Sequence, residues 1–158
     1  MDVEVALVLT SRPEITDAVT RGAARVLLDL GYASLAEVVL PNGRRADLMG
    51  LGPKGEFVIV EVKSGLEDFR ADMKWPEYAP FCDRFYFAVA PEFPREHLPT
   101  GPGLIICDSF GGAVIEEAPA SALASARRRA LTRAFARLAA FRGGERSRLG
   151  AGAEAWEG

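Results

Sequence analysis

The sequence predicts an α/β (α+β) domain in which a central mixed sheet is flanked by helices on both faces. Three observations indicate this class. Residues 56–63, EFVIVEVK, form an apolar run typical of a strand that is covered on both sides. Helical and strand patterns are interspersed along the chain. The chain has 158 residues, of which 49% are hydrophobic, and this suffices for one core without disulfide or zinc cross-links.

The elements are expected in the order helix, three-stranded meander, short helix, two strands and a long helix. Residues 11–31 have apolar residues at helical spacing, with a capping box at Ser11 and Glu14 and a stop at Gly31. Residues 66–75 have the pattern of a short amphipathic helix, which Pro76 ends. The long helix is expected over about 120–142. Strands are expected at 34–40, 44–51, 56–63, 83–90 and 103–109, with a small edge strand at 113–117.

We expect a single domain over residues 1–142 and a flexible tail over 143–158, where the sequence is glycine-rich and aperiodic. No uncharged apolar run is long enough for a membrane span. The acidic start, MDVE, differs from the basic start of a signal peptide, so we expect a cytoplasmic protein. Two cysteines are too few for a disulfide framework or a four-thiolate zinc site, and one histidine argues against histidine-rich metal sites.

The charge is distributed unevenly along the chain. Residues 121–150 contain eight arginines and one acidic residue, Glu145, whereas the whole chain has a net charge of -3. A basic helix attached to an acidic body is consistent with a protein that places a metal ion near a polyanion such as DNA. A solvated helix face is the alternative interpretation.

The chemistry is expected where a carboxylate enters the buried strand. The loop Pro53-Lys54-Gly55 sets Gly52 opposite Glu56, and the same register sets Asp47 opposite Glu61. Opposed side chains have β-carbons roughly 4.5–5.5 Å apart, so the two carboxylates repel each other unless a divalent cation lies between them. We therefore expect a Mg²⁺ site.

Two neighbours on the same strand complete the expected site. The carbonyl oxygen of Val62 can add a ligand, and Lys63 lies two residues from Glu61 on the same face. Its amine can orient a water molecule or neutralise phosphate charge. Arg45 shares the face of Asp47 and can bind a phosphate. A salt bridge between Glu61 and Lys63 without any metal is the alternative.

Asp47 followed by Glu61-Val62-Lys63 resembles the D-x(n)-E-x-K core of the PD-(D/E)XK nuclease superfamily, with Ala46 in place of the proline. The wider stretches look like the MmcB-like family of bacterial proteins, described as endonucleases associated with DNA repair. These stretches are NGRRADL, EFVIVEVKSG, DFRADMKWPEY and CDRFYFAVAPEFP, and the resemblance covers roughly residues 11–142.

The resemblance implies a restriction-endonuclease-like fold in which Asp47 and Glu61 bind Mg²⁺ or Mn²⁺ and Lys63 is the catalytic lysine. Superfamily members often add an acid from the first helix. Glu14 is the candidate here, Asp17 is the second choice, and Glu37 on the following strand is a further one. Glu14 as a helix cap and Glu37 as an exposed strand residue are the alternatives.

Further positive and aromatic residues are candidates for DNA contacts. Lys74 and Tyr78 occupy the region where RecB-type nucleases carry a Gln-x-x-x-Tyr element, although the glutamine is missing here. Trp75 and Tyr78 packed as core aromatics are the alternative. The expected nucleic-acid-binding residues are Arg44, Arg45, Lys74, Arg129 and Arg133.

The predicted function is therefore a Mg²⁺-dependent DNA endonuclease or phosphodiesterase acting in DNA repair, in which metal-activated water hydrolyses the DNA backbone. DNA is the expected partner, with other DNA-repair proteins as further candidates. A non-catalytic module of the same fold, which binds DNA or docks repair proteins, is the alternative.

Overall fold

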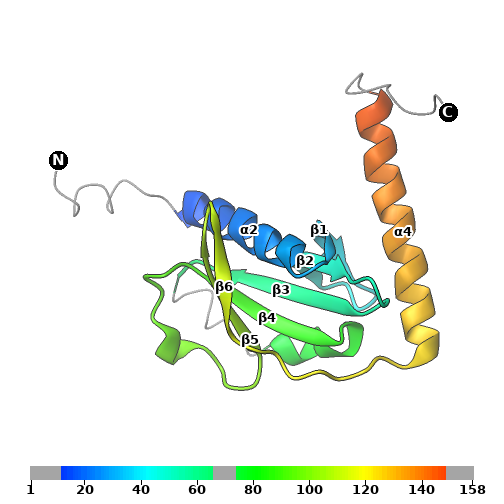
Figure 1. The fold of residues 1–158 in the computed structure, drawn as a ribbon. Coiled ribbons are helices and arrows are strands. Elements are labelled where there is room, and N and C mark those ends of the chain that lie inside the picture. Colours follow the sequence, from blue (N-terminus) through cyan, green and yellow to red (C-terminus); the bar gives the residue numbers. More distant parts are fainter. Residues whose placement is uncertain (1–11, 66–73, 149–158) are drawn as a thin grey trace. The chain divides into compact units, whose positions relative to one another are not determined.

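The computed structural model describes residues 12–65 and 74–148, and the chain divides after Leu123 into two compact units. The first unit holds a six-stranded sheet (Figure 1). Helix α2 (Arg12–Asp29) precedes the strands β1 (Ala33–Val39), β2 (Arg45–Leu51), β3 (Phe57–Lys63), β4 (Arg84–Val89), β5 (Gly103–Asp108) and β6 (Gly111–Glu116). The 3-10 helices η1 (Trp75–Glu77) and η2 (Ala79–Phe81) follow β3, and η3 (Arg95–His97) follows β4.

The strands lie in the sheet in the order in which they occur along the chain. The β3–β4 and β4–β5 pairs are parallel, and the other three pairs are antiparallel, so the sheet is mixed. The hairpin between β2 and β3 has the predicted register: Gly52 donates its N–H to the carbonyl oxygen of Glu56, and Gly55 has a φ of 84°. A loop residue with positive φ favours glycine, which explains why the sequence alone predicted this register.

Helix α2 covers one face of the sheet. Its apolar residues pack on the alternate residues of β3 that point towards it, and this cluster contains Val19, Ala23, Val26, Leu27, Val58, Val60 and Val62. On the opposite face, Trp75 and Tyr78 from the segment of η1 and η2 pack on Phe85 of β4. The predicted class, a mixed sheet with helices against it, is confirmed.

The long helix differs from its predicted bounds. Helix α4 (Ser125–Arg148) belongs to the second unit and starts later than predicted. Residues just before it are tied to Asp83, whose carbonyl oxygen accepts the N–H of Ser121 and whose carboxylate accepts the N–H of Leu123. The helix also ends later than the predicted end at about 142, because it continues through Gly143 and Gly144 to Arg148. The flexible C-terminal tail stays a prediction. Two glycines together lower the stability of a helix by about 2 kcal/mol. The neighbouring arginines and alanines, which favour helices, offset this loss.

Several predictions fall outside the described residues. These are the capping residue Ser11, most of the short helix at 66–75, and the end of the chain from residue 149. Neither helix in the described ranges combines the length and apolar character that crossing a membrane requires. Both cysteines are buried and free, and burial raises the pKa of Cys82 to about 12 and that of Cys107 to about 11. They are therefore small core residues, as predicted.

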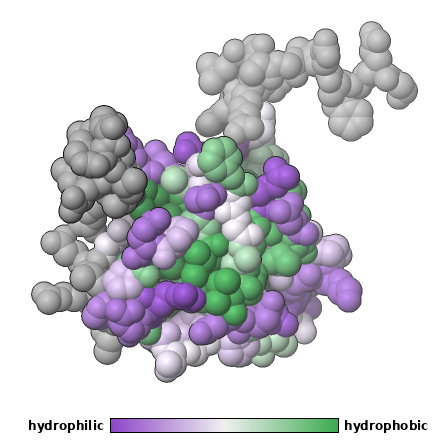
Figure 2. Space-filling view, turned by 60° about the vertical axis from the view of Figure 1, so that its left-hand side comes forward, coloured by the Kyte–Doolittle hydropathy of each residue, from purple (hydrophilic) through white to green (hydrophobic). Residues whose placement is uncertain are grey.

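Hydrophobic side chains also reach the surface. Figure 2 shows one face on which they form an area bordered by hydrophilic side chains. Among the described residues, the most exposed aromatic side chain is that of Phe110, in the turn between β5 and β6, at 92%. Scattered exposed apolar residues are normal in folded proteins, so this feature alone assigns no function to that face.

The contact between α2 and β5 depends on a glycine. A β-carbon at Gly22 would overlap the carbonyl oxygen of Asp108 at the end of β5. We therefore expect Gly22→Ala to lower the free energy of unfolding by about 1–3 kcal/mol, although alanine favours helices. The matched control is Gly143→Ala in α4, where nothing lies within 4 Å and where stability should rise by up to about 1 kcal/mol. Urea unfolding measures both, and a stabilising effect of Gly22→Ala would contradict the close packing.

Candidate metal and nuclease site

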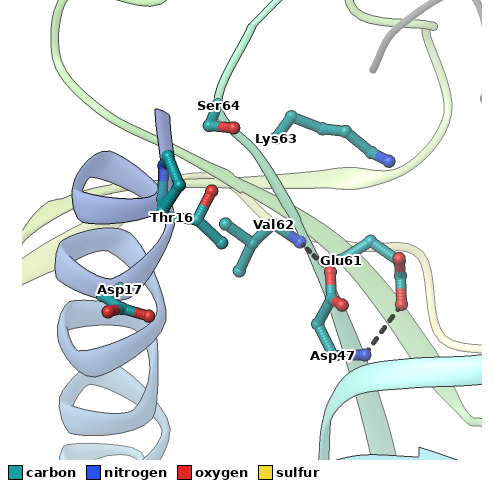
Figure 3. A pocket seen from close by; sticks show the side chains of 8 residues that line it. Thr16, Asp17, Asp47, Glu61, Val62, Lys63 and Ser64 are labelled. Carbon is teal, nitrogen blue, oxygen red and sulfur yellow. Dashed lines mark hydrogen bonds between the residues drawn. The ribbon is translucent and has the colours of Figure 1, made fainter. Parts of the chain in front are cut away.

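Two carboxylates meet where β2 and β3 separate. The regular pairing of these strands ends at Leu48 and Val60, and Asp47 and Glu61 come next along the two strands. Beyond that point, carboxylate oxygens accept the hydrogen bonds that backbone carbonyl oxygens accept in a regular ladder. The N–H of Asp47 donates to Oε1 of Glu61 at 3.0 Å, and the N–H of Val62 donates to Oδ2 of Asp47 at 2.8 Å. Each carboxylate is thus oriented by the backbone of the neighbouring strand (Figure 3).

Burial and mutual repulsion change the protonation of this pair. Glu61 is 5% exposed. Burial first, and then the negative charge of Asp47, raise the pKa of Glu61 to about 8. Burial also raises the pKa of Asp47, although the hydrogen bond from Val62 and the charges of Lys63 and Arg45 oppose that rise. Both effects favour one proton held by the metal-free pair at neutral pH.

Lys63 places a positive charge beside the carboxylates. Its side chain is 8% exposed, and its charge lowers the pKa of both Asp47 and Glu61. The pKa of Glu61 remains raised despite this charge, so the lysine does not fully offset burial and the charge of Asp47. An internal salt bridge between Glu61 and Lys63 without a metal stays the alternative interpretation of these residues.

The carboxylates open onto a cleft of about 620 Å³. In Figure 3 the side chain of Val62 lies between helix α2 and the carboxylate pair, and Ser64 follows Lys63 at the end of β3. The cleft is lined by Pro13, Thr16, Asp17, Asp47, Glu61, Val62, Lys63 and Ser64. The cleft therefore joins the start of α2 to the end of β3, and it holds the complete D…E-x-K motif.

The donor atoms of this site are suited to a hard divalent cation. The backbone bonds engage Oδ2 of Asp47 and Oε1 of Glu61, so one oxygen of each carboxylate remains for a ligand. Mg²⁺ and Mn²⁺ prefer such carboxylate oxygens and usually keep several waters. Among the residues that the structure describes, no group of three or more His, Cys, Asp or Glu side chains converges. Two carboxylates are thus the acidic ligands that the described cleft brings together.

Comparison with known proteins identifies the family. The family model described as "DNA repair protein MmcB-like" matches residues 4–147. The chain belongs to the MmcB-like family. A solved structure, the SPO1766 protein of unknown function from Silicibacter pomeroyi, is 43% identical with a TM-score of 0.81, and the match covers 90% of this chain and 97% of that one. No match was found among curated proteins.

The first helix of this MmcB-like protein brings a different acid to the cleft from the one first expected. Asp17 lines the cleft, whereas Glu14 is exposed on the first turn of α2 and does not. Apolar packing determines which face of a helix lies against a sheet. The capping pattern at Glu14 contains no information about that packing. Thr16 and Ser64 also line the cleft and were not predicted. The position of Ser64 directly after Lys63 was the one available signal.

Glu37 lies on β1 across from Asp47. It is exposed, lies outside the lining of the cleft, and has a φ of 50°. Regular pairing of β1 with β2 includes Ala36 and Val38 but skips Glu37. Positive φ is uncommon for residues other than glycine, so β1 carries local backbone strain beside the site. Glu37 therefore has an unusual backbone conformation, but its side chain does not line the cleft.

Some of the remaining candidates near the site make contacts within the protein, and the others are exposed. Arg44 forms an ion pair with Glu77 of η1 and lies outside the cleft. Tyr78 is buried, packs on Phe85 with 5.6 Å between ring centroids, and donates its hydroxyl to the carbonyl oxygen of Arg45 at 3.4 Å. Half-buried Trp75 stacks on Phe85 at 5.9 Å, so both aromatics pack against the sheet. Arg45 and Lys74 are exposed.

Proposed function

We propose that this MmcB-like protein is a DNA nuclease that requires Mg²⁺ or Mn²⁺ and hydrolyses phosphodiester bonds within DNA during repair. The observation that carries the proposal is the convergence of Asp47, Glu61 and Lys63 in one cleft, with the pKa of Glu61 raised to about 8. Perturbed carboxylates in a cleft are typical of functional sites. Membership of a family of DNA repair proteins supports DNA as the substrate, and the motif resembles that of the PD-(D/E)XK superfamily.

Each residue of the motif has a distinct role in this proposal. Asp47 and Glu61 hold the cation, and Val62 contributes its carbonyl oxygen. The backbone hydrogen bonds to the two carboxylates keep them oriented before the cation arrives. When held by these residues, Mg²⁺ would supply Lewis-acid chemistry, polarising a phosphate oxygen and lowering the pKa of a water molecule. Lys63 contributes positive charge next to the scissile phosphate. Asp17, on the opposite wall of the cleft, supplies the acid from the first helix through water.

Contacts to the DNA backbone come from exposed positive side chains. Arg45 begins β2 close to Asp47, and Lys74 precedes η1. Arg129 and Arg133 are exposed on α4 in the second unit. Such contacts to phosphates position DNA without reading its sequence. We propose the cytoplasm as the compartment, which two free and buried cysteines favour. Repair proteins are further proposed partners.

The direct test is a cleavage panel. The full chain is incubated with duplex, single-stranded, flapped and branched DNA in Mg²⁺, in Mn²⁺ and in EDTA. We expect cleavage of at least one substrate with either cation and none in EDTA, because the proposed chemistry needs the ion in the cleft. Retention of DNA without any cleavage under all conditions would contradict the nuclease and favour the non-catalytic DNA-binding module.

A further inference from the structure

Helix α4 carries a row of arginines that ends in an exposed phenylalanine. Arg129, Arg133, Arg137 and Phe141 follow each other at intervals of four residues. They therefore lie along one side of the helix, about 6 Å apart in the direction of its axis. All four side chains are exposed, and Phe141 is 64% exposed. We call these four residues the arginine ridge.

The surroundings of the arginine ridge leave it accessible. The same side of α4 carries small side chains, which cannot shield the arginines from a polymer that approaches the helix. These exposed residues are Ala126, Ala130, Ala134, Ala136 and Ala140. The large apolar residues Leu131 and Phe135 lie on the other side of the helix and are buried. The ridge therefore lies on an exposed side of α4, away from these two buried residues.

The charges of the ridge are not neutralised by nearby acids. Arg129 and Arg133 form no ion pair with any residue in the described ranges, whereas Arg25, Arg44 and Arg84 elsewhere in the chain do. The sequence of α4 contains one acidic residue, Glu145. Unpaired arginines in a row at regular spacing are complementary to a row of phosphates.

Phe141 indicates which form of DNA would bind. The guanidinium of Arg137 lies 5.5 Å from the centroid of the Phe141 ring, so a cation and an aromatic face are presented together. In duplex DNA the base faces are stacked inside the helix and cannot reach such a ring. In an unpaired strand a base can stack on the ring while its phosphates contact arginines.

We propose that the arginine ridge binds single-stranded DNA, with the three arginines on phosphates and Phe141 stacked on one base. This inference deepens the proposed function, since it names an unpaired strand as part of the substrate, and it rests on that function for the choice of DNA. The second unit would then hold the unpaired strand, whatever chemistry the cleft of the first unit performs.

The test is fluorescence anisotropy of the full chain with labelled oligo-dT and with a duplex of equal length, both in EDTA so that no cleavage occurs. Phe141→Ala should weaken oligo-dT binding by about 5- to 100-fold, the value of one stacked base, with little effect on the duplex. Phe141→Trp should retain binding, and Phe141→Leu should not. Phe110→Ala is the matched control, because it removes an even more exposed ring from the first unit.

A triple change of Arg129, Arg133 and Arg137 to glutamine should weaken binding and reduce the salt-dependence slope by about 2. Circular dichroism confirms that α4 stays helical in each variant. Unchanged oligo-dT affinity of Phe141→Ala would overturn the proposal, as would tighter binding to duplex DNA, to oligo-U or to anionic lipid vesicles. Parallel cleavage assays in Mg²⁺ keep the two proposals apart: cleavage without ridge-dependent binding rejects the ridge alone, and ridge-dependent binding without cleavage rejects the nuclease alone.

Discussion

Replacing Glu61 by glutamine is expected to abolish cation-dependent DNA cleavage while the fold stays intact. Glutamine keeps the shape of the side chain, and its Oε1 can still accept the N–H of Asp47. Its amide N–H group can also donate to the Asp47 carboxylate. The amide has no negative charge for a cation, however. Because Lewis-acid stabilisation is worth several kcal/mol, the rate should fall by at least about 100-fold.

The control for this prediction uses the same chemical change on the same hairpin. Glu56→Gln alters a carboxylate that accepts the N–H of Lys54 in the turn between β2 and β3 and lies outside the cleft. It should cleave DNA at the rate of the unchanged protein. Initial rates on the best substrate of the panel, with thermal unfolding as a check of folding, compare the two variants. Undiminished cleavage by Glu61→Gln would remove Glu61 from the proposed mechanism.

The stability of the metal-free protein is expected to fall as pH rises through neutrality. The ordinary pKa of Glu61 is 4.5, and the folded value is about 8 because of burial and the charge of Asp47. Between these values the folded protein holds a proton that the unfolded chain has released. The stabilising contribution is therefore complete below about pH 4.5 and is lost as pH approaches 8. At ~1.4 kcal/mol for each unit of pKa shift, the loss amounts to a few kcal/mol.

The measurement is urea unfolding in EDTA at pH values from 5 to 8.5 for the unchanged protein and for Glu61→Gln. Other groups also titrate in this range, so the informative quantity is the difference between the two proteins. As pH rises, the free energy of unfolding of Glu61→Gln should increase relative to that of the unchanged protein. Mg²⁺ at pH 8 should restore stability to the unchanged protein and not to the variant, because a ligand stabilises only the state that binds it. A difference that does not vary with pH would contradict the buried pair.

The local parts of the site could be predicted from the sequence. Gly55 is suited to the positive φ of a three-residue loop, and that loop sets the register that brings Asp47 and Glu61 to adjacent positions. The alternation in β3 correctly assigned Val58, Val60 and Val62 to one face, which packs on α2. The strand bounds differ from the prediction by at most two residues at either end, because side-chain periodicity and turn residues report local backbone geometry directly.

Other parts of the site depend on contacts between residues that are distant in the sequence. The acid of α2 that lines the cleft is Asp17 and not Glu14, because the packing of Val19, Ala23 and Leu27 on the sheet sets the rotation of the helix. Arg44 was a candidate for DNA contacts, but Glu77 pairs with it from η1. Neither result follows from residue spacing, since both require knowledge of which surfaces meet.

The sequence by itself therefore determined the mixed sheet, the hairpin register and the pairing of two carboxylates near a lysine, because these follow from local turn geometry and side-chain alternation. The tertiary structure alone decided that Glu61 is buried with a raised pKa, that α2 forms a wall of the cleft, and that Arg44 pairs with Glu77. Burial and charge pairing arise from the packing of separate elements, and no single stretch of sequence contains that information.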